Sequence, residues 1–334
     1  MILRYEHLAA RPRIFAAMTG LSPALFDDLA AELAPRVAAA RRAHRDRPGR
    51  TRAPGGGPAF ELGPVDALLL TVAWLRHYPT CEVLGYLFGV SKATASRTIA
   101  SALPLLEAAG RDTMRLPDPD RFRRRSLAAL LDRVPELAAL LREPAGPPTH
   151  SAAAPGPGPQ AVLVDTFEQA VRRPARRAEA DRWYSGKKRQ HTVKTQVAVC
   201  EASGRIVDVC GDAVGPFSDV TLLAASGLAR RLHPEIDLIG DGGFLGMAEF
   251  RTGGRALVPR RNHARRPLTK ADRQWNRVLA GRRVRAEHGI RRLRAYQSLS
   301  QRDRHHRRGH ERRVIAVAGL VNRRLGRTAS AAVA

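Results

Sequence analysis

Apolar residues in the N-terminal part of the chain recur at three- and four-residue intervals, as they do on the buried face of a helix. The clearest case follows Ser22 and Pro23, which form an N-cap and first-turn pair. The same spacing continues through the stretch VDALLLTVAWLRHY. We therefore expect residues 1–142 to form an all-α domain, whose first strong helix carries Leu25, Phe26, Leu29, Leu33 and Val37.

One stretch of this region, TCEVLGYLFGVSKATASRTIASALPLLEAA, predicts two short helices joined by a tight turn. Thr80 caps a helix that ends near Phe88, Gly89 supplies the turn, and Ser91 caps a second helix. Its residues Ala95, Ile99 and Leu103 share an inward face. This is the pattern of a helix-turn-helix, although a plain pair of packed helices has a similar pattern. In a helix-turn-helix the start of the second helix meets DNA, so the candidate contacts are Lys92, Thr94, Ser96 and Arg97.

Two low-complexity stretches interrupt the hydrophobic pattern. Arg41–Pro58 is basic and rich in Gly and Pro, which predicts a loop or arm. Residues 143–160 are rich in Pro, Gly and Ala and cannot pack a core. We therefore expect residues 143–160 to link two domains.

After the linker the pattern changes to strands alternating with helices. AVLVDTFEQAV reads as a strand with Asp165 at its end, and HTVKTQVAVCEASGRIVDVCGDA as an antiparallel hairpin turning at Ser203 and Gly204. SDVTLLAASGLARRL predicts a helix, and EIDLIGDGGFLG a buried strand that delivers Asp241 into a glycine-rich turn. A basic helix carrying Glu287 follows. The order predicts a mixed α/β domain over residues 161–326, followed by a tail at 327–334.

The amino-acid composition indicates that the protein binds a polyanion. The chain has 57 Lys and Arg against 31 Asp and Glu, a formal charge of +26, which is too large for an ordinary enzyme of small molecules. A GC-rich genome explains the preference for arginine but not the net charge. No apolar run approaches the ~18 residues of a membrane span, so we expect a cytoplasmic protein without a membrane partner.

Three carboxylates stand out against this charge. Asp165 and Asp241 each sit at the end of an apolar strand, and Glu287 lies among arginines. On neighbouring strands, the two aspartates would meet at one sheet edge and repel each other unless a cation bound there. Mg²⁺ prefers such oxygen ligands, and Glu287 would be the third. The alternatives are a turn-forming or capping role for each Asp and a solvated ion pair for Glu287.

Six stretches, in order from about Leu21 to Leu325, resemble the transposases of bacterial insertion sequences that belong to the DDE endonuclease superfamily, in the group of insertion sequence five. They are LRHYPTCEVLGYLFGVSKATASRTI, VLVDTFEQAVRRP, RWYSGKKRQHTVKTQV, GPFSDVTLL, LIGDGGFLG and RVRAEHGIRRLR. The resemblance implies an RNase H-like mixed-sheet catalytic domain preceded by an all-α helix-turn-helix domain. It also implies a metal-binding catalytic triad of Asp165, Asp241 and Glu287 that uses two Mg²⁺ ions, for which Mn²⁺ can substitute.

Several neighbouring residues follow or depart from the pattern of such transposases. Arg283 and Arg294 stand where related chains carry basic residues around the glutamate. Ala280 replaces a tyrosine of that element, and Thr166 replaces a glycine after the first aspartate. We interpret Lys187, Lys188, Arg283, Arg291 and Arg294 as further DNA-binding residues, and the histidines His305, His306 and His310 as part of a basic DNA-facing surface rather than a metal site.

The implied function is binding of insertion-sequence ends, followed by Mg²⁺-dependent strand cleavage and strand transfer. The implied partners are double-stranded DNA, both transposon ends and target, and further copies of the chain in a homodimer or larger assembly on the bacterial nucleoid. Two alternatives remain open. One is a helix-turn-helix regulator, and the other is a decayed or domesticated transposase that binds ends without cutting them.

Overall fold

The computed structural model describes residues 2–45, 61–119, 160–263, 267–305 and 309–331. The predicted linker lies outside these residues except for Gln160, as does most of the Arg41–Pro58 stretch and part of the C-terminal tail. The predicted loop start at Arg41 is wrong, because the preceding helix continues to Arg45.

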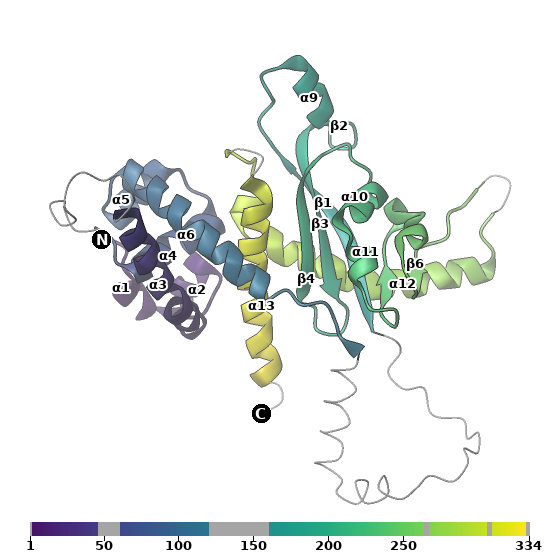
Figure 1. Ribbon diagram of the computed structural model, residues 1–334, viewed down its shortest axis with the longest axis horizontal. Coiled ribbons are helices and arrows are strands. Elements are labelled where there is room, and N and C mark those ends of the chain that lie inside the picture. Colours follow the sequence, from purple (N-terminus) through teal and green to yellow (C-terminus); the bar gives the residue numbers. More distant parts are fainter. Residues whose placement is uncertain (1, 46–60, 120–159, 264–266, 306–308, 332–334) are drawn as a thin grey trace, which may run out of the picture.

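The N-terminal region is all-helical, as predicted (Figure 1). Its central helix is buried from Ala67 to Leu75 and is surrounded by the others, which explains its nearly continuous apolar sequence. Phe15 and Phe26 pack edge to face with ring centroids 5.3 Å apart in the same core. The helices are α1 (Tyr5–Ala9), α2 (Pro12–Thr19), α3 (Pro23–Arg45), α4 (Pro64–His77), α5 (Cys81–Phe88) and α6 (Lys92–Asp112).

The helix-turn-helix prediction is confirmed at the level of its caps. The Thr80 hydroxyl accepts a hydrogen bond from the Val83 amide at 3.3 Å, and the Ser91 hydroxyl accepts one from the Thr94 amide at 3.0 Å. Gly89 ends α5 with φ +61°, a conformation that favours glycine. Ala95 and Ile99 are buried, so α6 presents the predicted face to the core.

The second region is built on a mixed sheet in the order β4-β3-β1-β5-β6, with β2 paired to the start of β3. β1 and β4 run antiparallel to β3, whereas β5 runs parallel to both β1 and β6. These pairings give the predicted RNase H-like α/β arrangement. The strands are β1 (Ala161–Ala170), β2 (Tyr184–Ser185), β3 (Gln190–Cys200), β4 (Ile206–Val214), β5 (Asp237–Ile239) and β6 (Ala256–Leu257).

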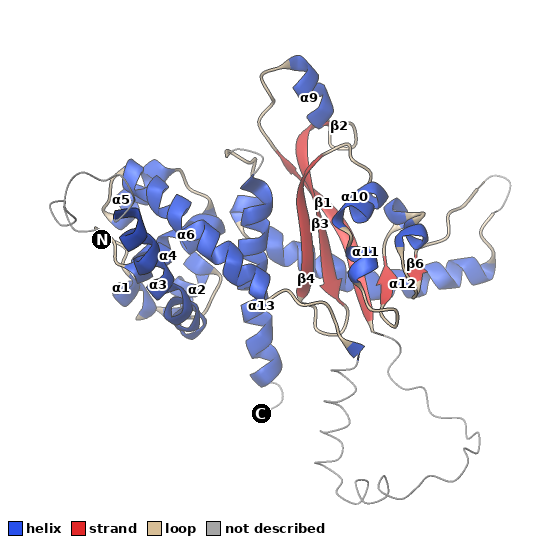
Figure 2. Ribbon diagram, viewed as in Figure 1, coloured by secondary structure: helices blue, strands red, loops and turns tan. Residues whose placement is uncertain are grey.

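Helices cover both faces of the sheet (Figure 2). α10 (Asp219–Ser226) and α11 (Leu228–Arg231) lie on one face, and α12 (Lys270–Arg294) and α13 (His310–Ala331) on the other. The single helix predicted from Ser218 is wrong, because Gly227 with φ +66° divides it into α10 and α11. An element that was not predicted, α9 (Arg177–Trp183), projects between β1 and β2.

The two regions share one hydrophobic core across the α6–α13 contact. Gly110 of α6 meets Gly319 of α13 so closely that a Cβ on either would overlap the opposite backbone. The Tyr78 hydroxyl adds a hydrogen bond to Asp303 at 3.1 Å. The helix-turn-helix is therefore fixed against the sheet domain. The sequence analysis, which divided the chain into two domains joined by a linker, did not predict this contact. Among the described helices, none is by itself long and apolar enough to cross a membrane; α2 and α3 meet that test only as a pair bent by 59°.

Candidate active site and DNA-binding surface

Asp165 and Asp241 are brought to the same level by the register of two parallel strands. β1 and β5 pair with Leu163 opposite Ile239, and each aspartate lies two residues farther along its strand direction. The prediction that Asp165 ends its strand is wrong, because β1 continues to Ala170. It continues because β3 still pairs with its other edge, from Asp165 opposite Val197 to Ala170 opposite Thr192. Asp165 therefore sits where the β5 side of β1 becomes open.

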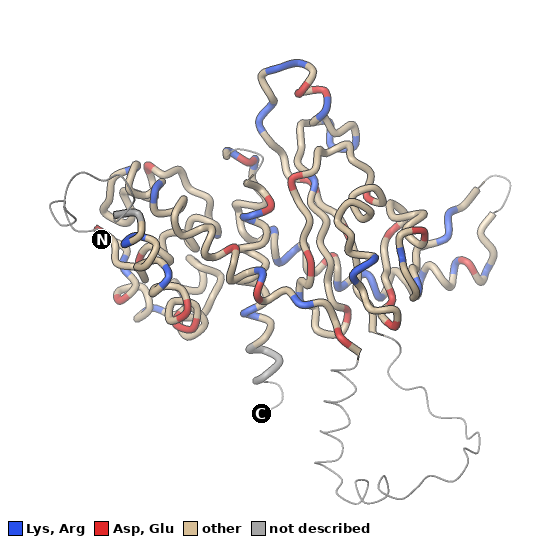
Figure 3. Tube along the Cα trace, in the orientation of Figure 1, with Lys and Arg blue, Asp and Glu red and all other residues tan. Residues whose placement is uncertain are grey.

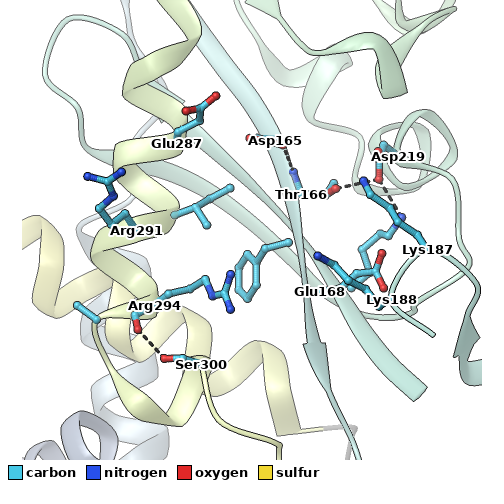
Figure 4. Close-up of a pocket in the computed structure, with 14 residues that line it drawn as sticks. Asp165, Thr166, Glu168, Lys187, Lys188, Asp219, Glu287, Arg291, Arg294 and Ser300 are labelled. Carbon is cyan, nitrogen blue, oxygen red and sulfur yellow. Dashed lines mark hydrogen bonds and ion pairs between the residues drawn. The ribbon is translucent and has the colours of Figure 1, made fainter. Parts of the chain in front are cut away.

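Glu287 approaches from α12, which packs on the sheet. Gly289 allows this approach, because a Cβ there would lie 2.8 Å from a Val199 methyl of β3. Glu287 and Asp165 line the same pocket of about 700 Å³, and both lie near its upper end in Figure 4. Within the described part of the chain Glu287 forms no ion pair with its arginine neighbours. This weakens the alternative that Glu287 serves only as an ion-pair partner.

The charge state of Asp165 is perturbed by this environment. The pKa of its carboxyl is raised to about 6, mainly by burial and also by the charges of Asp241 and Asp219. The Thr166 amide, which donates to Asp165 Oδ1 at 2.8 Å, and the guanidinium of Arg283, 3.9 Å from Oδ2, act in the opposite direction. Asp165 is therefore a partly desolvated carboxylate among other carboxylates, with one nearby cation.

Asp241 is fixed at the start of the turn that follows β5. Its Oδ1 accepts a hydrogen bond from the Gly243 amide at 2.8 Å and caps the short helix η1 (Gly242–Phe244). A Cβ on Gly243 would overlap Asp219 Oδ2 and lie 3.0 Å from Asp241 Oδ1. The glycine is needed because the carboxylates of Asp219 and Asp241 both border it.

The donor set fits a hard divalent cation, because the side chains involved offer carboxylate oxygens only. A cation beside Asp165 would also offset the burial, and the smaller repulsion by other carboxylates, that raise its pKa. The three carboxylates do not form a ready-made cage, since no group of three or more His, Cys, Asp or Glu in the described residues is arranged to hold a metal ion. The metal set of Asp165, Asp241 and Glu287 therefore stays a prediction.

The pocket curves around the open edge of β1 and receives side chains from both faces of the sheet. Its basic lining includes four of the predicted DNA-binding residues, Lys187, Lys188, Arg291 and Arg294, all of them exposed. The fifth, Arg283, is only 17% exposed and lies against Asp165 instead. The pocket thus combines acidic groups near the strand edge with cations on the surrounding walls.

Three polar residues at this edge were not assigned by the sequence analysis. The Thr166 hydroxyl donates to Asp219 Oδ1 at 2.8 Å, so the residue that replaces glycine in the motif is tied to α10. The Lys194 ammonium donates to the same oxygen at 2.9 Å. All three line the pocket. Lys194 lies in the stretch HTVKTQV. A lysine in the middle of a predicted strand was the one feature of the sequence that could have marked it as a site residue.

The predicted recognition surface of α6 is accessible. Lys92, Ser96 and Arg97 are exposed, and Thr94 is half-buried with its hydroxyl 2.9 Å from that of Ser91. Lys92 also lies 3.6 Å from Glu82 of α5, an exposed pair that contributes little. Figure 3 shows Lys and Arg distributed over both regions, including α12 and the segment around α9.

The interpretation of the histidines as a DNA-facing surface is wrong for His310. Its ring is fully buried at the start of α13, between Gln169 of β1 and Thr195 of β3. His305 is exposed, with its ring 5.1 Å from that of Trp74, and His306 lies outside the described residues. His310 is therefore part of the packing between α13 and the sheet.

Comparison with known proteins agrees with this architecture. Residues 164–322 match the family model described as DDE superfamily endonuclease, and residues 60–112 match that of the helix-turn-helix of DDE superfamily endonuclease. The chain is 24% identical over 273 residues to a probable transposase for insertion sequence element IS702 from Microchaete diplosiphon, covering 82% of this chain and 84% of that protein. No solved structure matches. Both matched models come from one superfamily and occur in the order seen in the fold, so the chain carries the helix-turn-helix and endonuclease regions of the DDE endonuclease superfamily and is similar to a transposase.

Proposed function

We propose that this protein binds the ends of an insertion sequence and catalyses divalent-metal-dependent cleavage and transfer of their DNA strands. The observation that carries the proposal is the alignment of Asp165 with Asp241 on parallel strands, with Glu287 lining the pocket beside Asp165. It acts in the bacterial cytoplasm on nucleoid DNA, as a homodimer or larger assembly. We also propose that the protein belongs to the group of insertion sequence five.

The two regions divide the work. The exposed start of α6, with Lys92, Ser96 and Arg97, enters the major groove of the end DNA, and Thr94 supports the same turn of helix. Because α6 is fixed to α13 through Gly110 and Gly319, DNA held by the helix-turn-helix has a defined position relative to the sheet domain of the same chain.

Asp165 and Glu287 in the pocket, with Asp241 at the end of the neighbouring strand, would supply the oxygen ligands of two Mg²⁺ or Mn²⁺ ions. When bound, the metal supplies activation of the attacking water or 3′-hydroxyl and stabilisation of the leaving oxygen. Arg291 and Arg294 hold phosphates of the bound strand from α12, while Lys187 and Lys188 hold them from the opposite wall. Arg283 balances the charge of Asp165. No covalent protein nucleophile is required.

Glu287→Gln tests the proposal because it keeps the side chain's size but removes the charge that balances a cation. Losing several kcal/mol of charge stabilisation lowers strand cleavage by about a hundredfold or more. Affinity for end DNA holds or rises, because one negative charge leaves a basic surface. Cleavage of labelled end duplexes with Mg²⁺, compared with EDTA, and binding by fluorescence anisotropy measure the two effects.

Glu249→Gln is the matched control, since Glu249 is exposed on η2 (Met247–Phe250) and does not line the pocket. It removes the same charge and leaves cleavage unchanged. Full cleavage by Glu287→Gln would remove Glu287 from the site and point to Glu168 or Asp219, the other acids that line the pocket. A wild-type protein that binds ends but never cuts with either metal would support the alternative, a non-catalytic DNA-binding protein.

A further inference from the structure

Lys194 is a buried lysine whose side chain reaches the candidate active-site pocket. It lies in the middle of β3, between Val193 and Thr195, and only 10% of its side chain is exposed. It nevertheless lines the pocket together with Asp165 and Glu287. Lysine is almost never this buried unless it is paired, so its position calls for a reason.

The ammonium of Lys194 is held in place by two protein acceptors. It donates to the Phe217 carbonyl at 2.6 Å and to Asp219 Oδ1 at 2.9 Å. An ammonium has three donors, and these two acceptors are its partners within the described residues. One N–H therefore remains for a group inside the pocket.

Hydrogen bonds connect the ammonium of Lys194 to β1, the strand that carries Asp165. Asp219 Oδ1, which holds Lys194, also accepts a hydrogen bond from the Thr166 hydroxyl at 2.8 Å. Thr166 is the residue after Asp165, and Asp219 Oδ2 borders Gly243 in the turn that holds Asp241. One carboxylate thus connects the lysine to the strand of Asp165 and lies beside the turn that holds Asp241.

Stability alone does not account for this ion pair. Replacing a buried ion pair by apolar residues of similar volume is often neutral or stabilising, because each ion must be taken out of water. On the face of β3 that carries Lys194, Ala198 and Cys200 are buried in an apolar cluster, so an apolar residue has a place on this face. The charge at Lys194 is better explained by a ligand of opposite charge in the pocket.

We propose that Lys194, oriented by Asp219, binds a non-bridging phosphate oxygen of the DNA strand that enters the pocket. Arg291 and Arg294 stand on the α12 side, and Lys187 and Lys188 lie across β1 from Glu287 (Figure 4). Lys194 would hold the DNA backbone beside Asp219, close to the strand that carries Asp165. The proposal rests on the proposed function, because it takes DNA as the occupant of this pocket.

A phosphate-replacement experiment tests the contact without relying on catalysis. End DNA is prepared with a single uncharged methylphosphonate at successive positions around the cleavage site, and its affinity is measured by anisotropy in EDTA and again with Mg²⁺. A charge-assisted hydrogen bond contributes enough that removing it weakens wild-type binding by about tenfold or more at the contacted position. The Lys194→Met variant binds unmodified DNA more weakly, to a similar extent. Its affinity no longer changes when a methylphosphonate is placed at that position.

Lys270→Met is the matched control, because Lys270 is exposed at the start of α12 and does not line the pocket. It loses one positive charge and keeps the wild-type response at every position. Since Lys194→Met leaves the Asp219 carboxylate without its counter-charge, the double variant Lys194→Met/Asp219→Leu removes both ions and provides a second folded protein to test.

The proposal is overturned if either folded variant keeps the wild-type response at every phosphate, under both metal conditions. In that case the ion pair only joins β3 to α10. A position-specific loss of response in a protein that never cleaves DNA would instead support the phosphate contact and refute the proposed catalysis. The two proposals therefore fail separately.

Discussion

His310 should make the protein sensitive to mild acid. The ring is fully buried, and burial together with the charge of Arg313 lowers its pKa to about 3. The side-chain amide of Gln169 donates to the carbonyls of Ser298 and Gln301, so its Oε1 accepts from His310 Nε2 at 2.7 Å. Nδ1 then accepts from the Thr195 hydroxyl at 3.2 Å, and the ring is neutral.

The magnitude follows from proton linkage. The unfolded chain protonates this histidine below its ordinary pKa of 6.5, whereas the folded protein does not do so until about pH 3. Stability is therefore lost as the pH falls through 6.5, at ~1.4 kcal/mol per pH unit once the unfolded state is fully protonated. Between pH 7.5 and pH 5.0 the expected loss is about 2 kcal/mol from His310 alone.

Comparison with His310→Gln isolates this contribution. Other buried groups change stability in the opposite direction; the pKa values of Asp212 and Glu311, for example, are raised by burial. Because these groups remain in both proteins, the difference between the two pH dependences belongs to His310. Urea unfolding followed by tryptophan fluorescence measures it, since Trp74 is buried in the shared core.

The variant should lose about 2 kcal/mol less than wild type between the two pH values, whatever its stability at pH 7.5. Equal losses in the two proteins would show that the unfolded and folded states protonate His310 alike. The ring would then be reachable by water, and the burial argument would be refuted.

Two further predictions concern the DNA-reading helix and its attachment. Arg97→Ala should weaken binding of end DNA and lower the slope of log affinity against log salt by about one, because an exposed cation at the start of α6 is lost. Arg230→Ala, on α11, removes an exposed cation elsewhere and is the control. An unchanged affinity of the Arg97→Ala variant would contradict the assignment of α6 as the DNA-binding helix. Gly319→Ala should destabilise the protein by ~1–3 kcal/mol because its Cβ overlaps Gly110, whereas Gly281→Ala, with open space around it, should stabilise by ~0.5–1 kcal/mol. Thermal unfolding compares the two, and equal effects would contradict the close α6–α13 crossing.

Features that depend on nearby residues could be predicted from the sequence. The caps at Thr80 and Ser91, and the turn at Gly89, each follow from the chemistry of one residue and the next few amides. The hairpin and the strand before Asp241 follow from apolar patterning bounded by glycines. The failures have a local cause too. The periodicity from Ser218 looked continuous, but Gly227 adopts a left-handed conformation that ends α10.

The arrangement of the site was decided only by the tertiary structure. Sequence marked Asp165, Asp241 and Glu287 as unusual, but the level at which the two aspartates meet depends on the register of β1 and β5, which are distant in the chain. The hydrogen bonds that connect Lys194 through Asp219 to Thr166 also join distant segments of the chain. His310 lies in a basic stretch that predicted an exposed surface, but packing of α13 on the sheet buries it. Local pattern fixes which elements form and which face is apolar; pairing and packing of distant segments decide which side chains meet, because those contacts carry no signal in their own neighbourhood of the sequence.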